Sequence, residues 1–444
     1  MILQFSVKNF KTFKEKATLS LIASNYDKKT READNIFNLD NFNLRILKSA
    51  VIYGANASGK SKFIEAFSFV RRFVINSSKG SQKGDTINVE PFKLNSETEN
   101  MPSEFEIIFV YKNVLYRYGF EVTTERVISE WLYYKAKTKE IELFYRDRDN
   151  FDTHERNFTK GKAIINHGLV RDNALLVSVA AQFNDNTAIN VIDWFKGLKT
   201  ISGLKGYDYQ GYTMGQMEDP LHKSKILSLL KIADLGIHDI TLKRLDIDNI
   251  PEEIPKEIKA KIIEKIKNKN TKIVSDVITT HKKYDSGNTY NGDVNFSLTK
   301  EESSGTRQFF ALIGPIINVL ENGYTLIIDE IDSKLHPNLV CRIISLFNSK
   351  EINKNNAQLI FNTHDTNLLS ANLFRRDQIW FTKKDRYGAA ELYSLSDFKS
   401  DKVKKNESFE DNYIKGKYGA VPYLNSFDTV NETISRYENE KQKN

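Results

Sequence analysis

The sequence predicts an α/β protein in which a mixed sheet is joined by an antiparallel β meander and a helical insertion. Two apolar runs, 49–53 and 324–330, have the composition of buried strands, and an amphipathic helix pattern follows the first of them closely. Between 88 and 146, four β-branched and aromatic runs are separated by short polar turns, which is typical of an antiparallel meander. Strands and helices therefore alternate along the chain, as an α/β fold requires.

Composition narrows the class of protein. The 444 residues are enough for two or three structural units, and 40% apolar with 28% charged residues is typical of a soluble globular protein. The single cysteine, Cys341, cannot form an internal disulfide, which favours a reducing cytoplasm. The most apolar stretch, 174–183, is about half a membrane span, and the first residues are charged too early for a signal peptide. We expect a cytoplasmic protein without a membrane segment. A net charge of +7 permits nucleic-acid contact without arguing for it.

The first 199 residues are expected to form an N-terminal lobe. They begin with two strands, ILQFSV and ATLSLI, and continue through a polar connector at 24–43. The strand at 49–53 enters a glycine-rich loop, and apolar residues at helical spacing predict a helix over 60–74. After the meander, helix resumes over 174–198.

Residues 200–295 are expected to form a helical insertion. One helix over 219–236 is closed by Gly236, and a second over 251–268 begins near prolines and carries Glu-to-Lys spacings that support an exposed helix. The lysine-dense run 256–283 is interpreted as a solvated helix face.

Residues 296–444 are expected to form a C-terminal lobe. It contains an apolar helix beginning near 304, the strand at 324–330 and a second strand at 357–364. The runs QIWFTKK and AELYSLS predict a closing hairpin, and the polar tail after Asn425 is expected to fray.

The loop GANASGKS at 54–61 fits the pattern Gly-x-x-x-x-Gly-Lys-Ser. Glycines let the backbone curl so that successive N–H groups face an anion, and the following helix adds its positive N-terminal end. Lys60 would reach the β- and γ-phosphates of a nucleotide, and Ser61 would ligate Mg²⁺. The alternative is a turn without a ligand, which the flanking strand and amphipathic helix disfavour. The nucleotide-binding candidates of this loop are Gly54, Ala55, Asn56, Ala57, Ser58, Gly59, Lys60 and Ser61.

Two strand ends carry further candidate groups. Asp329 and Glu330 end an apolar strand, at the carboxyl edge where α/β sheets bind ligands. Asp329 would hold Mg²⁺ opposite Ser61, and Glu330 would orient and deprotonate an attacking water. His364 follows the next apolar strand and could touch the γ-phosphate, the alternative being a capping or core histidine.

The stretch EESSGTRQF at 301–309 precedes an apolar helix. Ser304 and Gly305 could present a hydroxyl and backbone N–H groups at the helix N-terminus, which makes a second anion site. Taken alone, the same pattern is an ordinary capped helix start.

The order of these parts resembles the ABC-type ATPase heads, including those of SMC-type chromosome proteins. Within that group the sequence looks like the OLD-like branch of standalone bacterial defence ATPases, the abortive-infection type known as AAA family ATP-binding proteins. The stretches that carry the closer likeness are FSVKNFKTFKEKATLSL, KSAVIYGANASGKS, LLVSVAAQFN, IDEIDSKLHPNL and YIKGKYGAVPYL. The resemblance covers most of the chain except roughly 200–290.

The resemblance implies further site residues. Gln182 would take the Q-loop role of sensing Mg²⁺ and the γ-phosphate, the alternative being a polar cap on a buried segment. Lys11 and Thr12 stand where SMC-type heads place an Arg-Ser pair that contacts nucleotide. The stretch Ser303-Ser304-Gly305-Thr306-Arg307 stands where ABC heads have the signature Leu-Ser-Gly-Gly-Gln, and it departs from that signature. His336 stands where many ABC heads have the aspartate of the D-loop.

The resemblance also implies a function. We expect an ATPase that uses ATP and Mg²⁺ and that forms a homodimer or higher homo-oligomer, each ATP being capped by the other subunit's Ser304 and Gly305. From Asp365 on only 80 residues remain, too few for the nuclease domain of OLD nucleases, so a separately encoded nuclease or toxin effector in antiphage defence is expected. The alternative is an SMC- or recombination-type ATPase in DNA repair or maintenance. A transporter subunit and a non-catalytic nucleotide-binding scaffold fit less well.

Overall fold

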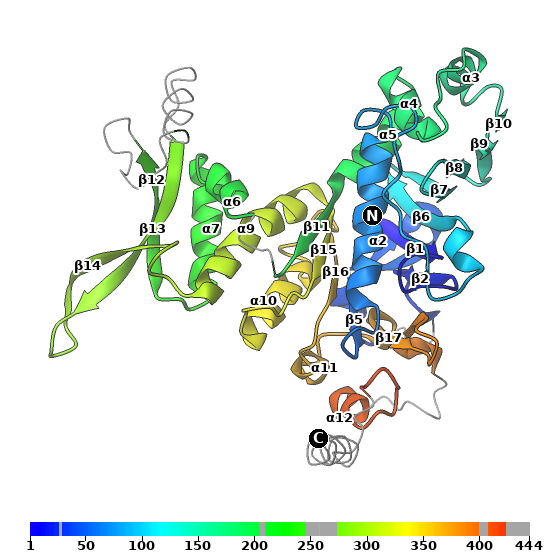
Figure 1. The fold of residues 1–444 in the computed structure, drawn as a ribbon. Coiled ribbons are helices and arrows are strands. Elements are labelled where there is room, and N and C mark those ends of the chain that lie inside the picture. The colour runs from blue at the N-terminus through cyan, green and yellow to red at the C-terminus, as the bar shows by residue number, and fades with distance from the viewer. Residues whose placement is uncertain (26–28, 205–208, 246–256, 258–272, 399–406, 423–444) are drawn as a thin grey trace, which may run out of the picture.

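The structure is a computed structural model of the 444-residue chain, and it describes residues 1–25, 29–204, 209–245, 257, 273–398 and 407–422. Two large sheets lie on either side of one long helix, α2 (Lys60–Asn76), and an arm of helices and strands extends from one of them (Figure 1). The predicted mixed α/β architecture is therefore confirmed.

The core sheet has six strands in the order β11-β15-β16-β5-β17-β18. All neighbours pair in parallel except β17 and β18, which form the predicted antiparallel hairpin. In chain order the strands are β5 (Ser49–Gly54), β11 (Leu198–Ser202), β15 (Thr325–Asp329), β16 (Gln358–Asn362), β17 (Ile379–Lys384) and β18 (Ala390–Ser394). Because β15, β16 and β5 are parallel neighbours in this order, their carboxyl ends meet at one edge of the sheet.

The second sheet has seven strands in the order β10-β9-β8-β7-β6-β1-β2, and every pair is antiparallel. It confirms the predicted meander and adds the N-terminal strands to its edge. The strands are β1 (Ile2–Lys8), β2 (Ala17–Ser20), β6 (Ser103–Tyr111), β7 (Val114–Val122), β8 (Val127–Lys135), β9 (Ile141–Asp147) and β10 (Asn150–Thr153).

Helix α2 is held between the two sheets by its aromatic face. The Phe5 ring of β1 stacks on Phe67, and Phe63 packs edge-on against the same Phe5. Ile52 and Ile327 of the core sheet belong to the same buried cluster, so the amphipathic pattern of this helix buries both faces. The helices α3 (Thr159–Asn166), α4 (Leu176–Gln182) and α5 (Asn186–Gly197) follow the meander, so the helix predicted over 174–198 is interrupted, at Asp185, which caps α5.

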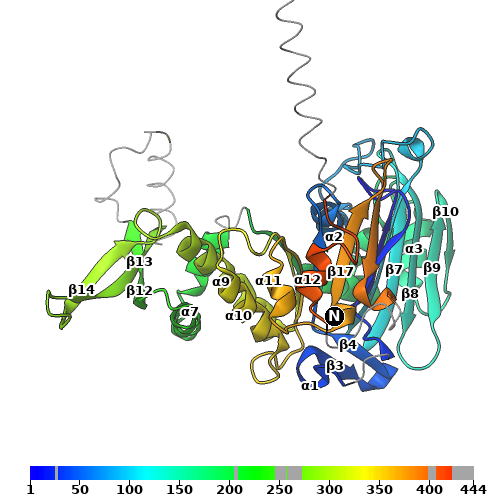
Figure 2. The same ribbon diagram turned by 90° about the horizontal axis from the view of Figure 1, so that it is seen from below.

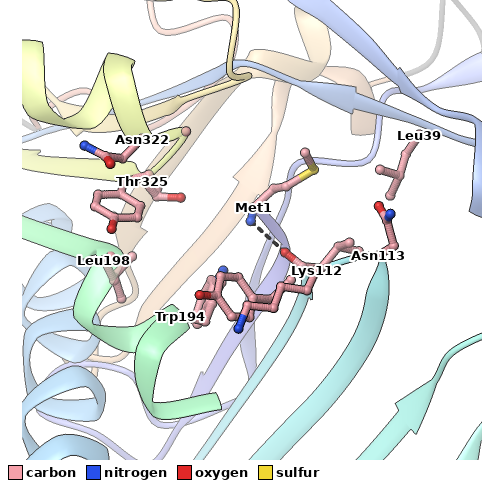
Figure 3. A pocket seen from close by; sticks show the side chains of 13 residues that line it. Met1, Leu39, Lys112, Asn113, Trp194, Leu198, Asn322 and Thr325 are labelled. Carbon is pink, nitrogen blue, oxygen red and sulfur yellow. Dashed lines mark hydrogen bonds between the residues drawn. The ribbon is translucent and has the colours of Figure 1, made fainter. Parts of the chain in front are cut away.

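Where the two sheets meet, a hollow of about 210 Å³ opens at the amino-terminal ends of β11 and β15 (Figure 3). Met1, Trp194 and Thr325 are among its lining residues, and the Met1 backbone nitrogen donates to the Val110 carbonyl at 2.9 Å. This hollow lies at the edge of the core sheet opposite to the carboxyl ends of the strands.

Among the described residues of the insertion, the first part is helical and the second part is a sheet, so the prediction of a helical insertion over 200–295 is corrected. Helices α6 (Gln210–Gln216) and α7 (Pro220–Ile232) are followed by an antiparallel sheet of β12 (Ile237–Leu245), β13 (Ile273–Tyr284) and β14 (Tyr290–Ser297) (Figure 2). Residues 273–283 of the lysine-dense run thus belong to a strand and not to a helix face. Its β-branched composition, IVSDVITT, favours a strand, and the lysines around it obscured that signal. The helix predicted over 251–268 lies outside the described residues except for Glu257, which is helical.

The remaining elements are short. The connector 24–43 contains α1 (Glu32–Asn35) and β3 (Ile36–Leu39), which pairs with β4 (Leu44–Leu47), and this pairing was not predicted. The C-terminal lobe contains α9 (Ser304–Asn322), α10 (Pro337–Asn348), α11 (Asn367–Ser370) and α12 (Phe409–Ile414). Across the described ranges, none of the helices is long and apolar enough to cross a membrane. The tail after Asn425 lies outside these ranges.

Candidate active site

The glycine-rich loop leaves β5 and enters α2 in a backbone conformation that depends on its two glycines. Gly54 has a φ of +156° and Gly59, the residue before the helix, a φ of +115°. A Cβ atom on Gly54 would lie 2.5 Å from the Thr382 carbonyl oxygen, and one on Gly59 would lie 3.1 Å from Thr12 Oγ1. Other residues would be strained at both positions, so the loop has the curled, side-chain-free form that lets N–H groups face an anion.

Lys60 is buried in this loop, and its ammonium is held by the loop's own backbone. Its Nζ donates to the carbonyl oxygens of Gly54 at 2.7 Å and Ala55 at 3.1 Å. Burial lowers the pKa of Lys60 to about 8, and the nearby carboxylates, Glu330 first, partly oppose that shift. A phosphate could therefore replace the two carbonyl oxygens and give the buried cation a full negative partner.

The strand order brings the two predicted acidic residues to the loop. Strand β16 lies between β5 and β15, so Asp329 and Glu330 are two strand spacings, or about 10 Å, from the strand that enters the loop. Glu330 has a φ of +54°, an uncommon value for a residue other than glycine that turns the chain sharply at the strand end.

Asn362, at the end of β16, links the two acids. Its side-chain Nδ2 donates to Asp329 Oδ1 at 2.5 Å, and its Oδ1 accepts the backbone N–H of Glu330. The side chain is fully buried, so it fixes both acids in place. Sequence analysis missed this residue, although a polar residue ending an apolar strand was a usable signal.

His364 lies on the same edge, two residues beyond Asn362. It is exposed, and its backbone N–H donates to Asp332 Oδ2 at 3.2 Å. The other oxygen of Asp332 is buried and has no hydrogen-bond partner among the described residues, and Asp332 was also missed. This orphaned acceptor at the loop edge is suited to a donor such as a water bound to a cation.

Thr12 and Lys11 lie beside the loop but differ in their contacts. The Thr12 hydroxyl oxygen is close to Gly59, is buried, and has no hydrogen-bond partner in the described part of the chain. It is therefore available to a ligand in the loop. Lys11 instead pairs with Glu65 at 2.5 Å and with Glu90 at 3.4 Å. Of the two residues, the structure favours Thr12 as a nucleotide contact.

The structure does not bring Gln182 to the loop, and this expectation is corrected. Gln182 ends α4, whose Ser178 hydroxyl lies 2.8 Å from that of Ser78, just past the C-terminal end of α2. The loop lies at the opposite end of this helix of 17 residues, or about 25 Å away at 1.5 Å per residue (Figure 1). The resemblance implied that Gln182 contacts the nucleotide, but Gln182 belongs to α4, which packs near the C-terminal end of α2.

Ser304 and Gly305 form the first turn of α9. The residue before them caps the helix, as expected for an ordinary capped helix start. Ser303 is the N-cap, and its hydroxyl accepts the Thr306 N–H at 3.1 Å. Gln308, in the second turn, donates to the Gly203 carbonyl just beyond β11 at 2.7 Å. The start of α9 is therefore on the far side of β15 from the loop. His336 caps α10 in a similar way, its Nδ1 accepting the Asn338 N–H at 3.2 Å.

The residues at this edge fit a magnesium nucleotide. The curled loop, the buried Lys60 and the orphaned Thr12 hydroxyl suit an anion, and Ser61 with Asp329 supplies oxygen ligands of the kind Mg²⁺ takes. No group of three or more His, Cys, Asp or Glu side chains arranged for a metal occurs within the described ranges. Such a group is unnecessary here, because Mg²⁺ in phosphate-loop sites takes most ligands from phosphates and waters.

Comparisons with known proteins give one family match. Residues 49–370 match the family described as "AAA domain, putative AbiEii toxin, Type IV TA system". No curated protein matches the chain.

Solved structures that resemble the chain include two SMC heads and one component of an ABC transporter complex. The SMC head domain from Thermotoga maritima is 12% identical over 88% of this chain and 98% of that chain, with a TM-score of 0.41. An SMC head bound to the C-terminal winged-helix domain of ScpA is 16% identical over 88% and 97%, with a TM-score of 0.37. CbiO1 from Clostridium perfringens, part of the ABC transporter complex cbiONQ, is 9% identical over 87% and 95%, with a TM-score of 0.26.

Proposed function

Because the chain belongs to this AAA-domain family and has the fold of a P-loop ATPase, we propose that it is an ATP-driven dimerisation switch. In this proposal two chains pair head to tail around bound ATP, and hydrolysis releases them. The observation that carries the proposal is the convergence of Lys60, Asp329 and Glu330 at one sheet edge, with the start of α9 directed to a different place.

The loop and its neighbours would bind the nucleotide. Backbone N–H groups of residues 54–61 and the N-terminus of α2 would surround the phosphates, and Lys60 would exchange its two carbonyl acceptors for phosphate oxygens. Ser61 and Asp329 would hold Mg²⁺, which when bound neutralises charge that develops on the transferred phosphoryl group. Thr12 would donate its unpaired hydroxyl to the nucleotide.

Glu330 would act on the water. Glu330 has a strained backbone, and its N–H donates to the Asn362 side chain. Both features would hold the Glu330 carboxylate near the loop. A carboxylate held there can orient the attacking water and accept its proton, while His364 on the next strand contributes a donor to the γ-phosphate.

The position of α9 supports pairing. Its first turn lies beyond β15 and β11 as seen from the loop, so Ser304 and Gly305 are not placed to cap the phosphates of their own chain. A second chain turned to face the first would bring its helix N-terminus to the exposed side of the nucleotide. The site would then be complete only in the dimer.

In the cell, this switch would control a separately encoded effector, a nuclease or toxin, during phage infection. The family description, which names a putative AbiEii toxin and a type IV TA system, supports a place in such systems. The output would be a change of conformation and assembly rather than a chemical product.

The test is Glu330→Gln, with exposed Glu351→Gln as the matched control. We expect the first variant to bind ATP, to lose hydrolysis by about 10²-fold and to accumulate as a dimer with ATP, because only water activation is removed. Light scattering with and without ATP and steady-state phosphate release measure these outcomes. A variant that stays monomeric with ATP, or wild-type turnover that requires duplex DNA, would contradict the proposal.

A further inference from the structure

A second cationic pocket lies away from the loop, where the two lobes and the insertion meet. It has a volume of about 290 Å³, and we call it the junction pocket. Its walls come from α2, β11, α6 and α9, and in Figure 1 β11 lies between α2 and the pair α6 and α9. The residues that the argument uses are Arg71, Lys199, Tyr209, Tyr212, Pro315 and Asn318.

Two cations face this pocket, and neither has a carboxylate partner among the described residues. The Nε atom of Arg71 is buried and lacks a hydrogen-bond partner, and no acidic side chain pairs with Arg71 in the part of the chain that the structure describes. Lys199 makes one hydrogen bond, from Nζ to the Lys196 carbonyl at 2.8 Å, and lies over the Tyr324 ring. Burial lowers the pKa of both groups, and the Arg71 charge lowers that of Lys199 further. Two unpaired cations that repel each other are stabilised by an anion.

The remaining lining is aromatic and polar. Tyr212 is 45% exposed, so its ring is accessible, while Tyr209 donates its hydroxyl to the Thr200 carbonyl at 3.1 Å and is fixed in place. Asn318 can donate or accept hydrogen bonds. A phosphate next to cations and a planar ring against tyrosine is how proteins hold nucleotides, and the volume is at the lower end of ligand pockets.

One wall of the pocket is formed by α9 at Pro315, a proline inside the helix. Pro315 has no N–H, so the Ala311 carbonyl loses its helix partner, and the Thr213 hydroxyl of α6 donates to it at 3.1 Å. The same hydroxyl accepts the Gly314 N–H at 3.2 Å. Helix α6 therefore packs on α9 at its proline, a position where helices can bend, and a ligand in the pocket would contact α9 at Pro315 and Asn318.

We propose that the junction pocket binds a phosphate monoester of mononucleotide size and that its occupancy regulates ATP hydrolysis. The phosphate lies between Arg71 and Lys199, and the base packs against Tyr212. Three of the four elements that line the pocket lead to parts of the active site. Helix α2 begins at the phosphate loop, β11 pairs with the strand that ends in Asp329, and α9 begins at Ser304.

The experiment uses the full chain with Lys60→Ala, which weakens binding at the loop, and measures AMP binding by equilibrium dialysis. We expect one AMP per chain. Adding Arg71→Gln should weaken AMP binding at least about 10-fold because a charge-assisted hydrogen bond is lost, and Arg71→Lys should weaken it less. Arg72→Gln, the same charge change at an exposed neighbour on α2, should leave AMP binding within about 2-fold.

A further variant and further ligands test the proposal without relying on the Arg71 variants alone. Asn318→Asp places a carboxylate in the pocket from a different helix and should weaken AMP binding even if the Arg71 variants fold poorly. Inorganic phosphate should compete weakly and adenosine not at all, and AMP should change wild-type ATP hydrolysis but not that of Arg71→Gln. Equal AMP affinity in the Arg71→Gln and Arg72→Gln proteins, binding of phosphate but not AMP, or no AMP binding overturns the proposal. Wild-type protein without ATPase activity would overturn the proposed function but leave the AMP binding result valid.

Discussion

Helix α2 carries two cations that differ in how the protein holds them. Lys60, in the first turn, is buried and donates to two carbonyl oxygens of its own loop. Arg71 lies eleven residues later, or about 16 Å along the axis at 1.5 Å per residue, and its buried Nε has no hydrogen-bond partner within the described ranges. Lys60 is therefore held by the loop that precedes it, whereas Arg71 lines a pocket built from four elements.

The difference shows which kind of site a sequence can display. The loop site is made by one continuous segment, because its glycines, its lysine and the helix start are neighbours in the chain. The junction pocket needs residues from positions 71 to 318, and none of them forms a motif. Local sites can be found by pattern, and assembled sites only by packing.

The largest expected effect tests the first of these sites. Lys60→Ala should reduce ATP hydrolysis by about 10²-fold or more, because the buried charge that faces the phosphates is removed. Lys62→Ala is the control, since the Lys62 ammonium pairs with Glu65 at 2.7 Å instead of with the loop carbonyls. Phosphate release at saturating ATP measures both. Equal losses in the two variants would mean that the loop lysine has no special role.

A smaller effect is expected at the residue that joins the two acids. Asn362→Ala removes the hydrogen bonds to Asp329 and to the Glu330 N–H, and should lower the turnover number about 10-fold with a smaller change in the Michaelis constant. Exposed Asn338→Ala should match wild type, and thermal melting checks that the first variant remains folded. Unchanged turnover in a folded Asn362→Ala protein would show that Glu330 is positioned without this link.

Much of this edge was predictable and part of it was not. The strands at 49–54, 325–329 and 358–362 and the closing hairpin follow from apolar runs. The glycine-rich motif and the strand ends predict Lys60, Asp329, Glu330 and His364 as site residues, and the structure places these residues at one edge of the core sheet. Asn362 gains its role only because β16 lies between β5 and β15, and strand order is not written in any single run. The sheet of β12, β13 and β14 was missed because lysines mask its β-branched pattern. Gln182 was misplaced because a resemblance to a family implies the role of a residue but does not show how its helix packs.

The α9 wall of the junction pocket can be tested through stability. A Cβ on Gly314 would lie 2.5 Å from Thr213 Oγ1 and 2.9 Å from Thr213 Cα, so Gly314→Ala should force α6 from α9 and destabilise the fold by about 1–3 kcal/mol. Gly211 is also inside a helix but has nothing within 4 Å, and Gly211→Ala should stabilise the fold by about 0.5–1 kcal/mol. Urea unfolding measures both free energies. The same sign for both variants would contradict the close approach of α6 and α9.

The smallest expected effect is at the far end of α2. Gln182→Ala should change ATP hydrolysis by less than about 2-fold, because α4 packs near Ser78 while the nucleotide would lie at the opposite end of the helix, about 25 Å away. A loss of about 10-fold in the steady-state rate would require that Gln182 reaches a nucleotide on another chain or that α4 moves when ATP binds. Repeating the measurement in Glu330→Gln separates these cases, since a glutamine supplied by another chain would also weaken the ATP-dependent dimer, whereas a glutamine that moves within its own chain would weaken ATP binding in the monomer first.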